Sequence, residues 1–325
     1  MELVREEAID PAPLQGKRVA ILGFGNQGRA QALNLNDSGI DVVVGLRTGS
    51  PTRTEVKNAG LWIAPPAEAA ETSDVVMLLA PDEILGDLYS EIAPHLREGA
   101  ALGFSHGLAV HFGFIEPRED LDVFLVAPKG PGTALRALYR EGKGMVALWA
   151  VAQDPSGSAR DIALAYGRAI GCGRAGLIAS SFEEEAVADL FNENAVVWGG
   201  VPELLRAGFE TLVKAGISPE VAYLECVGEL KLIAELIDAR GIAGMREAIS
   251  NTAELGAVLG GPAVIGPEIR DRMEEVLRSV RSGDFARALR TEAKTGYAQL
   301  ENARKAARSQ PIEQVYKRLK DLPGS

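Results

Sequence analysis

The sequence predicts a doubly wound α/β domain followed by an all-helical domain. Three observations support this prediction. Short apolar runs alternate with helical segments through the first half of the chain, a glycine-rich turn follows the first of these runs, and no convincing strand pattern occurs after about Ser180. Continuous apolar strands between helices are typical of a parallel sheet covered on both faces. We therefore expect domains at residues 1–180 and 181–325.

The first domain is expected to alternate strands and helices along the chain. Apolar runs predict strands at residues 18–22, 41–45, 61–63, 74–80, 100–104, 123–127, 145–151 and 174–178. Helical spacing predicts helices at residues 27–37, 55–60, 67–72, 84–95 and 159–170. In the second domain, segments separated by Gly and Pro predict helices at residues 182–198, 202–215, 219–239, 244–259, 268–282 and 284–305.

The composition excludes several classes of protein. Lys and Arg number 34 and Asp and Glu 45, so the formal charge is 34 − 45 = −11. This balance disfavours nucleic-acid partners and attachment to anionic membranes. Two cysteines, Cys172 and Cys226, cannot build a disulfide framework, and three histidines leave little for a Cys/His zinc site. The charged residues 1–10 lack an apolar targeting segment, so we expect a cytoplasmic protein.

The sequence Gly23-Phe24-Gly25-Asn26-Gln27-Gly28 matches the pattern G-x-G-x-x-G. It follows the first predicted strand and opens a predicted helix, which is the context that gives this pattern meaning. Its glycines let the backbone approach a pyrophosphate, and the helix supplies N–H donors at its N-terminus. We interpret it as the dinucleotide site of a Rossmann-type domain; the alternative is a purely structural turn.

The end of the second strand distinguishes NAD from NADP. NAD enzymes usually carry an acid here for the ribose 2′-hydroxyl. Residues 45–53 contain no acid, but they contain Arg47, Ser50, Thr52 and Arg53. Arginine binds phosphate through paired hydrogen bonds, and hydroxyls add donors. The loop therefore favours NADPH, and the alternative is a solvated basic loop.

Two predicted helices carry acids in apolar surroundings. Asp189 and Glu193 share one helix face, and Glu225 and Glu229 repeat this spacing in a segment that is apolar around most of its circumference. Burying four carboxylates is costly unless they are paired or bind metal. Oxygen ligands alone favour Mg²⁺ or Mn²⁺ over zinc. The alternative is that these are surface acids on amphipathic helices.

Two further polar residues follow predicted strands of the first domain. His106 follows the strand at 100–104, and Lys129 follows the strand at 123–127 between Pro and Gly residues. Ligands of open α/β sheets bind at the carboxyl ends of strands. Both residues are therefore candidates for the active site, with a structural histidine and a surface lysine as the alternatives.

The chain resembles the short class I ketol-acid reductoisomerases, also called acetohydroxyacid isomeroreductases, from about residue 16 to 319. The resemblance rests on motifs at residues 23–28, 105–107, 127–132, 153–154, 173–176, 189–191, 208–212, 225–226, 229–233 and 249–254. It implies a knotted helical domain, and an intertwined homodimer whose active sites are shared between subunits. Assembly beyond the dimer is left open.

The resemblance also implies roles for individual residues. Asp189 and Glu193 resemble the ligands of two Mg²⁺ ions from one subunit, and Glu225 and Glu229 resemble those from the partner. His106 and Lys129 resemble catalytic residues, with Glu229 as a proton relay, and Ser250 resembles a contact to the substrate carboxylate. The residues that resemble NADPH contacts are Gly23, Phe24, Gly25, Asn26, Gln27, Gly28, Arg47, Ser50, Thr52, Asp82, Glu83, Ile84, Leu85 and Gly132.

The implied reaction converts a 2-hydroxy-3-keto acid, acetolactate or acetohydroxybutyrate, into a 2,3-dihydroxy acid by Mg²⁺-dependent alkyl migration and reduction by NADPH. Leu108-Ala109 stands where the family usually has Phe-Asn, and Leu85 where it often has Gln. These departures leave substrate breadth and cofactor affinity open. Two rival functions are a plain NADPH dehydrogenase, which does not need the acid pairs, and a dinucleotide sensor without turnover.

Overall fold

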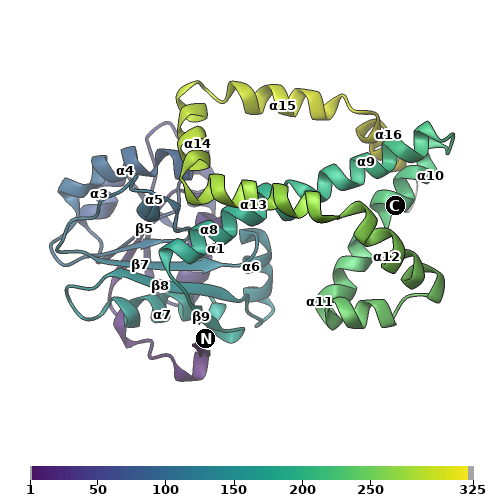
Figure 1. The fold of residues 1–325 in the computed structure, drawn as a ribbon. Coiled ribbons are helices and arrows are strands. Elements are labelled where there is room, and N and C mark those ends of the chain that lie inside the picture. The colour runs from purple at the N-terminus through teal and green to yellow at the C-terminus, as the bar shows by residue number, and fades with distance from the viewer. Residues whose placement is uncertain (1, 321–325) are drawn as a thin grey trace. The chain divides into compact units, whose positions relative to one another are not determined.

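The computed structural model describes residues 2–320, and Figure 1 shows its fold. The chain divides into two compact units, and the boundary falls between Ala188 and Asp189, inside helix α8 (Phe182–Phe191). In the described part of the chain, β9 (Leu177–Ala179) is the last strand. The change from strands to helices therefore precedes the division into compact units by most of one helix.

The first unit is built on a mixed sheet. Among the described residues this sheet has nine strands in the order β1-β9-β8-β7-β6-β5-β2-β3-β4. The other strands are β1 (Leu3–Val4), β2 (Arg18–Leu22), β3 (Asp41–Gly45), β4 (Trp62–Ala64), β5 (Val75–Leu78), β6 (Ala101–Phe104), β7 (Asp122–Pro128) and β8 (Ala147–Gln153). The expectation of a parallel sheet is wrong for two pairs, because β8 is antiparallel to β7 and β1 to β9. Apolar runs do not reveal this, because a buried strand is apolar whichever way it runs.

Helices cover both faces of the sheet (Figure 1). Alternate residues of each strand belong to different cores: Val19 and Ile21 of β2 pack with one cluster, and Ala20 and Leu22 with the other. The helices that contribute to the first cluster are α1 (Asn26–Asp37), α2 (Arg53–Asn58), α6 (Gly132–Arg140) and α7 (Ala159–Ala169). Those that contribute to the second are α3 (Pro66–Glu71), α4 (Leu85–Ile92), α5 (Leu108–His111) and, through Phe182, α8.

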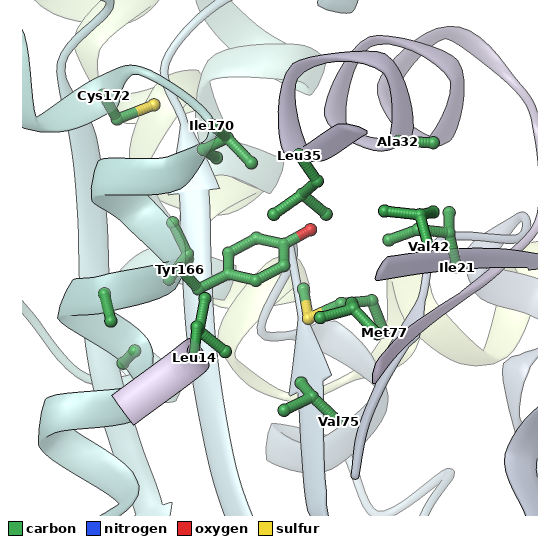
Figure 2. Close-up of a cluster of buried hydrophobic side chains, with 14 of the residues drawn as sticks. Leu14, Ile21, Ala32, Leu35, Val42, Val75, Met77, Tyr166, Ile170 and Cys172 are labelled. Carbon is green, nitrogen blue, oxygen red and sulfur yellow. The ribbon is translucent and has the colours of Figure 1, made fainter. Parts of the chain in front are cut away.

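Tyr166 lies at the centre of the first cluster. Figure 2 shows its ring extending from α7 among Leu14, Met77 and Leu35, with the hydroxyl on the side of α1. The side chain is fully buried, and its ring lies 5.9 Å from that of Phe124 in an edge-on arrangement. A buried tyrosine hydroxyl needs a polar partner, so this residue links the apolar core to a polar group.

The described residues of the second unit are helical. They continue α8 and then form α9 (Gly200–Lys214), α10 (Pro219–Tyr223), α11 (Leu230–Glu247), α12 (Asn251–Val264), α13 (Pro267–Arg281), α14 (Asp284–Lys294), α15 (Ala298–Arg308) and α16 (Pro311–Lys320). The helix predicted at 284–305 is interrupted, because Tyr297 adopts a left-handed backbone at φ 61°. None of the described helices is long and apolar enough to span a membrane.

Two π-helical turns interrupt the segments that carry the acid pairs. One spans Asn192–Val196 and includes Glu193; the other spans Leu224–Gly228 and includes Glu225. Such turns rotate the following side chains relative to an α-helix and are frequent at functional sites. A segment that is apolar around most of its circumference, as 219–239 is, is expected to be buried. This expectation is wrong for the single chain, because Leu232 on α11 is 60% exposed.

Candidate active site

The glycine-rich turn has the geometry of a phosphate-binding turn. Gly23 adopts φ +111°, and a Cβ on Gly28 would lie 2.3 Å from the Gly23 carbonyl oxygen, so neither position accepts a side chain without movement. A Cβ on Gly25 would meet nothing within 4 Å. Gly25 therefore keeps the backbone at the start of α1 open to a ligand, while the other two glycines allow the tight turn.

A second helix N-terminus lies beside the first. A Cβ on Gly132, the first residue of α6, would lie 2.1 Å from the Asn26 carbonyl oxygen, so only glycine permits this approach. The Thr133 N–H donates to Asn26 Oδ1 at 2.9 Å. Two positive helix ends thus flank one surface, which suits the binding of a pyrophosphate.

A cavity of about 660 Å³ extends from this turn. It is lined by Phe24, Gly25, Asn26, Arg29, Ala30, Leu33, Thr52, Glu55, Gly132, Thr133, Arg136 and Arg140. Five of the predicted cofactor residues are therefore in this lining. The loop predicted to select the nucleotide borders it through Thr52, whose hydroxyl lies 2.9 Å from that of Ser50.

The remaining predicted cofactor residues lie outside the cavity lining. Arg47 is exposed, whereas Arg53 donates to the Leu46 carbonyl at 3.0 Å and so fixes its own loop. Residues Asp82–Ile84 form a short 3₁₀ turn after β5. The Leu85 side chain is buried in the second core cluster, so it serves packing in this structure.

A buried carboxylate joins the loops that carry His106 and Lys129. Glu185 Oε2 accepts from His106 Nδ1 at 2.8 Å and from the Gly107 N–H at 2.7 Å, and Oε1 accepts from Lys129 Nζ at 2.9 Å. The Glu185 side chain is only 1% exposed. Because a carboxylate only accepts, the Nδ1 atom of His106 carries a proton.

Local packing sets the position of Glu185. Phe182 at the start of α8 packs edge-on against Phe104 of β6, with 6.0 Å between ring centroids. A Cβ on Gly107 would lie 2.2 Å from the Phe182 carbonyl oxygen, so the loop after β6 lies directly against α8. These contacts place the first turn of α8 over the carboxyl ends of the strands.

Partner charges determine the ionisation of Glu185. Its burial by itself favours the neutral acid and raises the pKa. The hydrogen bond and charge of His106, together with those of Lys129, outweigh this effect and lower the pKa of Glu185 to about 2. The carboxylate is therefore ionised at neutral pH.

Asp189 extends this group along the same helix. It follows Glu185 by four residues on α8, so the two carboxylates share one face of that helix. Glu193 follows after four more residues and is exposed, as are Glu225 and Glu229 in the single chain. Ser250 is the N-cap of α12, and its Oγ accepts from the Ala253 N–H at 3.2 Å.

Two acids near these sites, Glu185 and Glu55, were not predicted from the sequence. Glu185 precedes Asp189 and Glu193 at successive intervals of four residues, and this spacing was a usable signal. It was masked by the neighbouring acids Glu183 and Glu184, which make the segment look like a solvated helix start. Glu55 lies two residues beyond the loop at residues 45–53, yet it lines the nucleotide cavity and pairs with Arg29 at 3.4 Å.

Comparison with known proteins gives matches along nearly the whole chain. The family model "Acetohydroxy acid isomeroreductase, NADPH-binding domain" matches residues 13–176, and "Ketol-acid reductoisomerase, C-terminal domain" matches residues 182–323. The chain belongs to the ketol-acid reductoisomerase family. It is thus identified as a pyridine-nucleotide-dependent oxidoreductase and isomerase of branched-chain amino-acid biosynthesis, as its motifs predicted.

Solved structures agree with this assignment. An NADH-preferring ketol-acid reductoisomerase from an uncultured archean is 44% identical over 100% of both chains, with a TM-score of 0.96. A putative oxidoreductase from Jannaschia sp. is 20% identical, with a TM-score of 0.61 over 82% of this chain and 97% of that one. A semialdehyde dehydrogenase NAD-binding protein from Cupriavidus necator is also 20% identical, with a TM-score of 0.62 over 82% and 99%. The last two share the fold of the reductoisomerase chain.

The buried ion-pair group predicts an acid-dependent contribution to stability. The pKa of Glu185 is about 2 in the folded protein against 4.5 for the free group, so its contribution is complete above pH 4.5 and is lost as the pH falls toward 2. The free energy of unfolding of Glu185→Gln should differ from wild type most above pH 5, and this difference should shrink by up to about 3 kcal/mol in acid.

The measurement is urea unfolding from pH 7 to pH 2.5 with EDTA present. Glu183→Gln is the matched control, because Glu183 lies on the same first turn of α8 and is exposed. Equal pH dependence in both variants would contradict the assignment.

Proposed function

We propose that this reductoisomerase catalyses Mg²⁺-dependent alkyl migration in 2-acetolactate or 2-aceto-2-hydroxybutyrate, followed by reduction with NADPH to the 2,3-dihydroxy acid, in valine and isoleucine biosynthesis. The observation that carries the proposal is the Glu185 carboxylate. It holds His106 and Lys129 together at the carboxyl ends of β6 and β7, with Asp189 four residues along α8. A nucleotide cavity, a histidine, a lysine and acids on one helix face are the groups that this chemistry needs.

The proposed metal ligands suit two Mg²⁺ ions. Asp189 and Glu193 of one subunit, with Glu225 and Glu229 of the partner subunit, offer only carboxylate oxygens, which Mg²⁺ prefers and zinc does not require. Their four negative charges balance two divalent cations. When bound, the cations polarise the ketone and lower the pKa of the tertiary hydroxyl as Lewis acids.

The chain's own residues bind and orient the substrate in this proposal. Because Nδ1 of His106 donates to Glu185, Nε2 is the ring nitrogen that would exchange a proton with the substrate. Ser250 Oγ accepts a backbone N–H, so its own O–H remains available to donate to the substrate carboxylate at the start of α12. Glu229 relays the proton of the tertiary hydroxyl through a bound water.

The direct test is nucleotide consumption with 2-acetolactate. Wild type should turn over with Mg²⁺ and stop with excess EDTA, and Asp189→Asn should lower kcat by about a hundredfold or more. Glu183→Gln, an exposed acid on the same helix, should retain wild-type kcat. Turnover that survives EDTA would favour a plain dehydrogenase, and nucleotide binding without turnover would favour a sensor.

The loop after β3 supports NADPH as the reductant. Residues 45–53 hold no acid, and Arg47 is exposed beside the hydroxyl pair Ser50 and Thr52. The competing feature is Glu55, whose carboxylate lines the cavity and pairs with Arg29. Since this pairing offsets the charge of Glu55, we assign Arg47 and the two hydroxyls to the 2′-phosphate. The archaeal relative that prefers NADH makes this assignment the part of the proposal most worth testing.

Replacement of Arg47 should separate the two nucleotides. Arg47→Ala should raise the KM for NADPH by about tenfold and leave that for NADH nearly unchanged, because only NADPH carries the phosphate that arginine binds. Steady-state kinetics with both nucleotides provide the measurement. Lys57→Ala, which removes another exposed cation from α2, is the control. An equal rise for both nucleotides would refute the role of Arg47.

We also propose a homodimer with shared active sites. Leu232 on α11 and Leu255 and Leu259 on α12 are 60%, 60% and 68% exposed in the single chain. Large exposed apolar surfaces mark association sites, and two-fold symmetric dimers are the commonest solution. A second copy of the chain would cover these residues and bring its Glu225 and Glu229 to the other subunit's Asp189.

Mixing two inactive variants tests the shared site. Asp189→Asn and Glu229→Gln homodimers should each be inactive. Co-expressed, they form heterodimers in which one of the two sites has no substitution, so about a quarter of wild-type activity should return. If all ligands came from one chain, every chain would carry a defect and no activity would return.

We place the reductoisomerase in the cytoplasm. Cys172 and Cys226 are both free thiols in the structure, so the fold does not depend on an oxidising compartment. The net charge of −11 gives no basis for nucleic-acid or anionic-membrane partners.

A further inference from the structure

A chain of hydrogen bonds runs from the apolar core to the glycine-rich turn. The Tyr166 hydroxyl donates to Gln31 Oε1 at 2.6 Å, and Figure 2 shows this hydroxyl on the α1 side of the core. Gln31 Nε2 then donates to Gln27 Oε1 at 3.1 Å and to Ser105 Oγ at 3.0 Å. Tyr166 and Gln31 are both 0% exposed, so these bonds form without competition from water.

This chain of hydrogen bonds ends at the two loops that carry the proposed catalytic residues. Ser105 directly precedes His106, and its hydroxyl donates to the Val126 carbonyl at 2.9 Å. Gln27, inside the glycine-rich turn, donates from Nε2 to the Gly130 carbonyl at 2.8 Å. Gly130 directly follows Lys129, so the single amide of Gln31 is linked to both loops.

Each group in this hydrogen-bond network acts as a donor or an acceptor in a way that is consistent with its neighbours. Gln31 Nε2 uses both of its N–H bonds, and Ser105 Oγ accepts one hydrogen bond and donates one. Burial raises the pKa of Tyr166 well above its usual value, so its hydroxyl remains a donor to Gln31. A fully satisfied buried network holds its members in one arrangement.

Stability alone does not explain a buried amide at this position. An apolar side chain of similar size avoids the desolvation of the amide, as Leu35 does one turn further along α1. Asn34, the other buried amide of this helix, bonds to the Ile170 carbonyl and to Arg136 and not to the two loops. What the amide adds is direction, since its two donors diverge to Gln27 and Ser105. A methyl or methylene group has no equivalent.

We propose that Gln31 is a positioning residue of the reductoisomerase, which fixes the loops bearing His106 and Lys129 relative to the glycine-rich turn. The proposal rests on the proposed roles of those two residues. Gln31 itself touches neither His106 nor Lys129, and acts through Ser105 and Gln27. Small displacements of groups that must meet in a reaction lower kcat strongly, while binding contacts elsewhere persist.

Two variants separate positioning from stability. Gln31→Leu removes both divergent donors, whereas Tyr166→Phe removes only the donor on the far side of Gln31 and also leaves a buried polar atom unpaired. We expect both to lower the thermal midpoint. Gln31→Leu should lower kcat by about tenfold or more with the nucleotide Kd changed less than about threefold, and Tyr166→Phe should leave kcat within about twofold.

A double variant tests the route through Ser105. Ser105→Ala should lower kcat in the same direction, and adding it to Gln31→Leu should lower kcat by no more than about twofold further, because both substitutions break the same link. If the fold losses of kcat in the two single variants instead multiplied in the double variant, the coupling through Ser105 would be overturned.

Hydrogen exchange measures the loops without relying on turnover. Peptides covering residues 105–107 and 129–132 should exchange faster in Gln31→Leu than in wild type, with little change in Tyr166→Phe. This result supports the positioning role even if 2-acetolactate proves not to be the substrate. Equal loop exchange in the two variants, or losses of kcat that follow the thermal midpoint in both, would overturn it.

Discussion

A carboxylate that is 1% exposed must find donors, and Glu185 finds three: the imidazole of His106, the backbone N–H of Gly107 and the ammonium of Lys129. Removing any one of them would leave this buried carboxylate with one hydrogen bond fewer. The loops after β6 and β7 and the first turn of α8 are therefore held together by one electrostatic requirement. The placement of Asp189, four residues further along α8, follows from the same anchor.

The sheet makes this meeting of distant residues possible. β6 and β7 are parallel and paired from Ala101 with Asp122 to Phe104 with Leu125, so the loops that follow them leave the sheet side by side. β2 runs in the same direction, and its following turn starts α1 at the same edge. Gln31 on α1 then links that turn to both loops through buried hydrogen bonds. The nucleotide site and the loops around Glu185 are therefore positioned by the same strands and the same buried hydrogen bonds.

The helical unit follows a different constraint. Leu232 on α11 and Leu259 on α12 are exposed in the single chain, and Glu225 and Glu229 lie in the segment that leads into α11. One π-helical turn contains Glu193 of the first acid pair, and the other contains Glu225 of the second. In the proposed dimer, one apolar surface serves two purposes: its burial stabilises the assembly, and it brings each subunit's acids to the other's site.

The sequence by itself determined the family, the alternation of strands and helices in much of the first domain, the glycine-rich turn and the acid pairs, because these depend on local spacing and residue type, but it predicted no helix at α5, α6 or α16. Strand direction at β8 and the interruption at Tyr297 were decided by the fold, since apolar runs carry no direction and a single left-handed residue leaves no periodic trace. Glu185 looked like one of three solvated acids along the chain. Only the tertiary structure buries it, because the donors that make its burial possible come from residues 56 to 79 positions away.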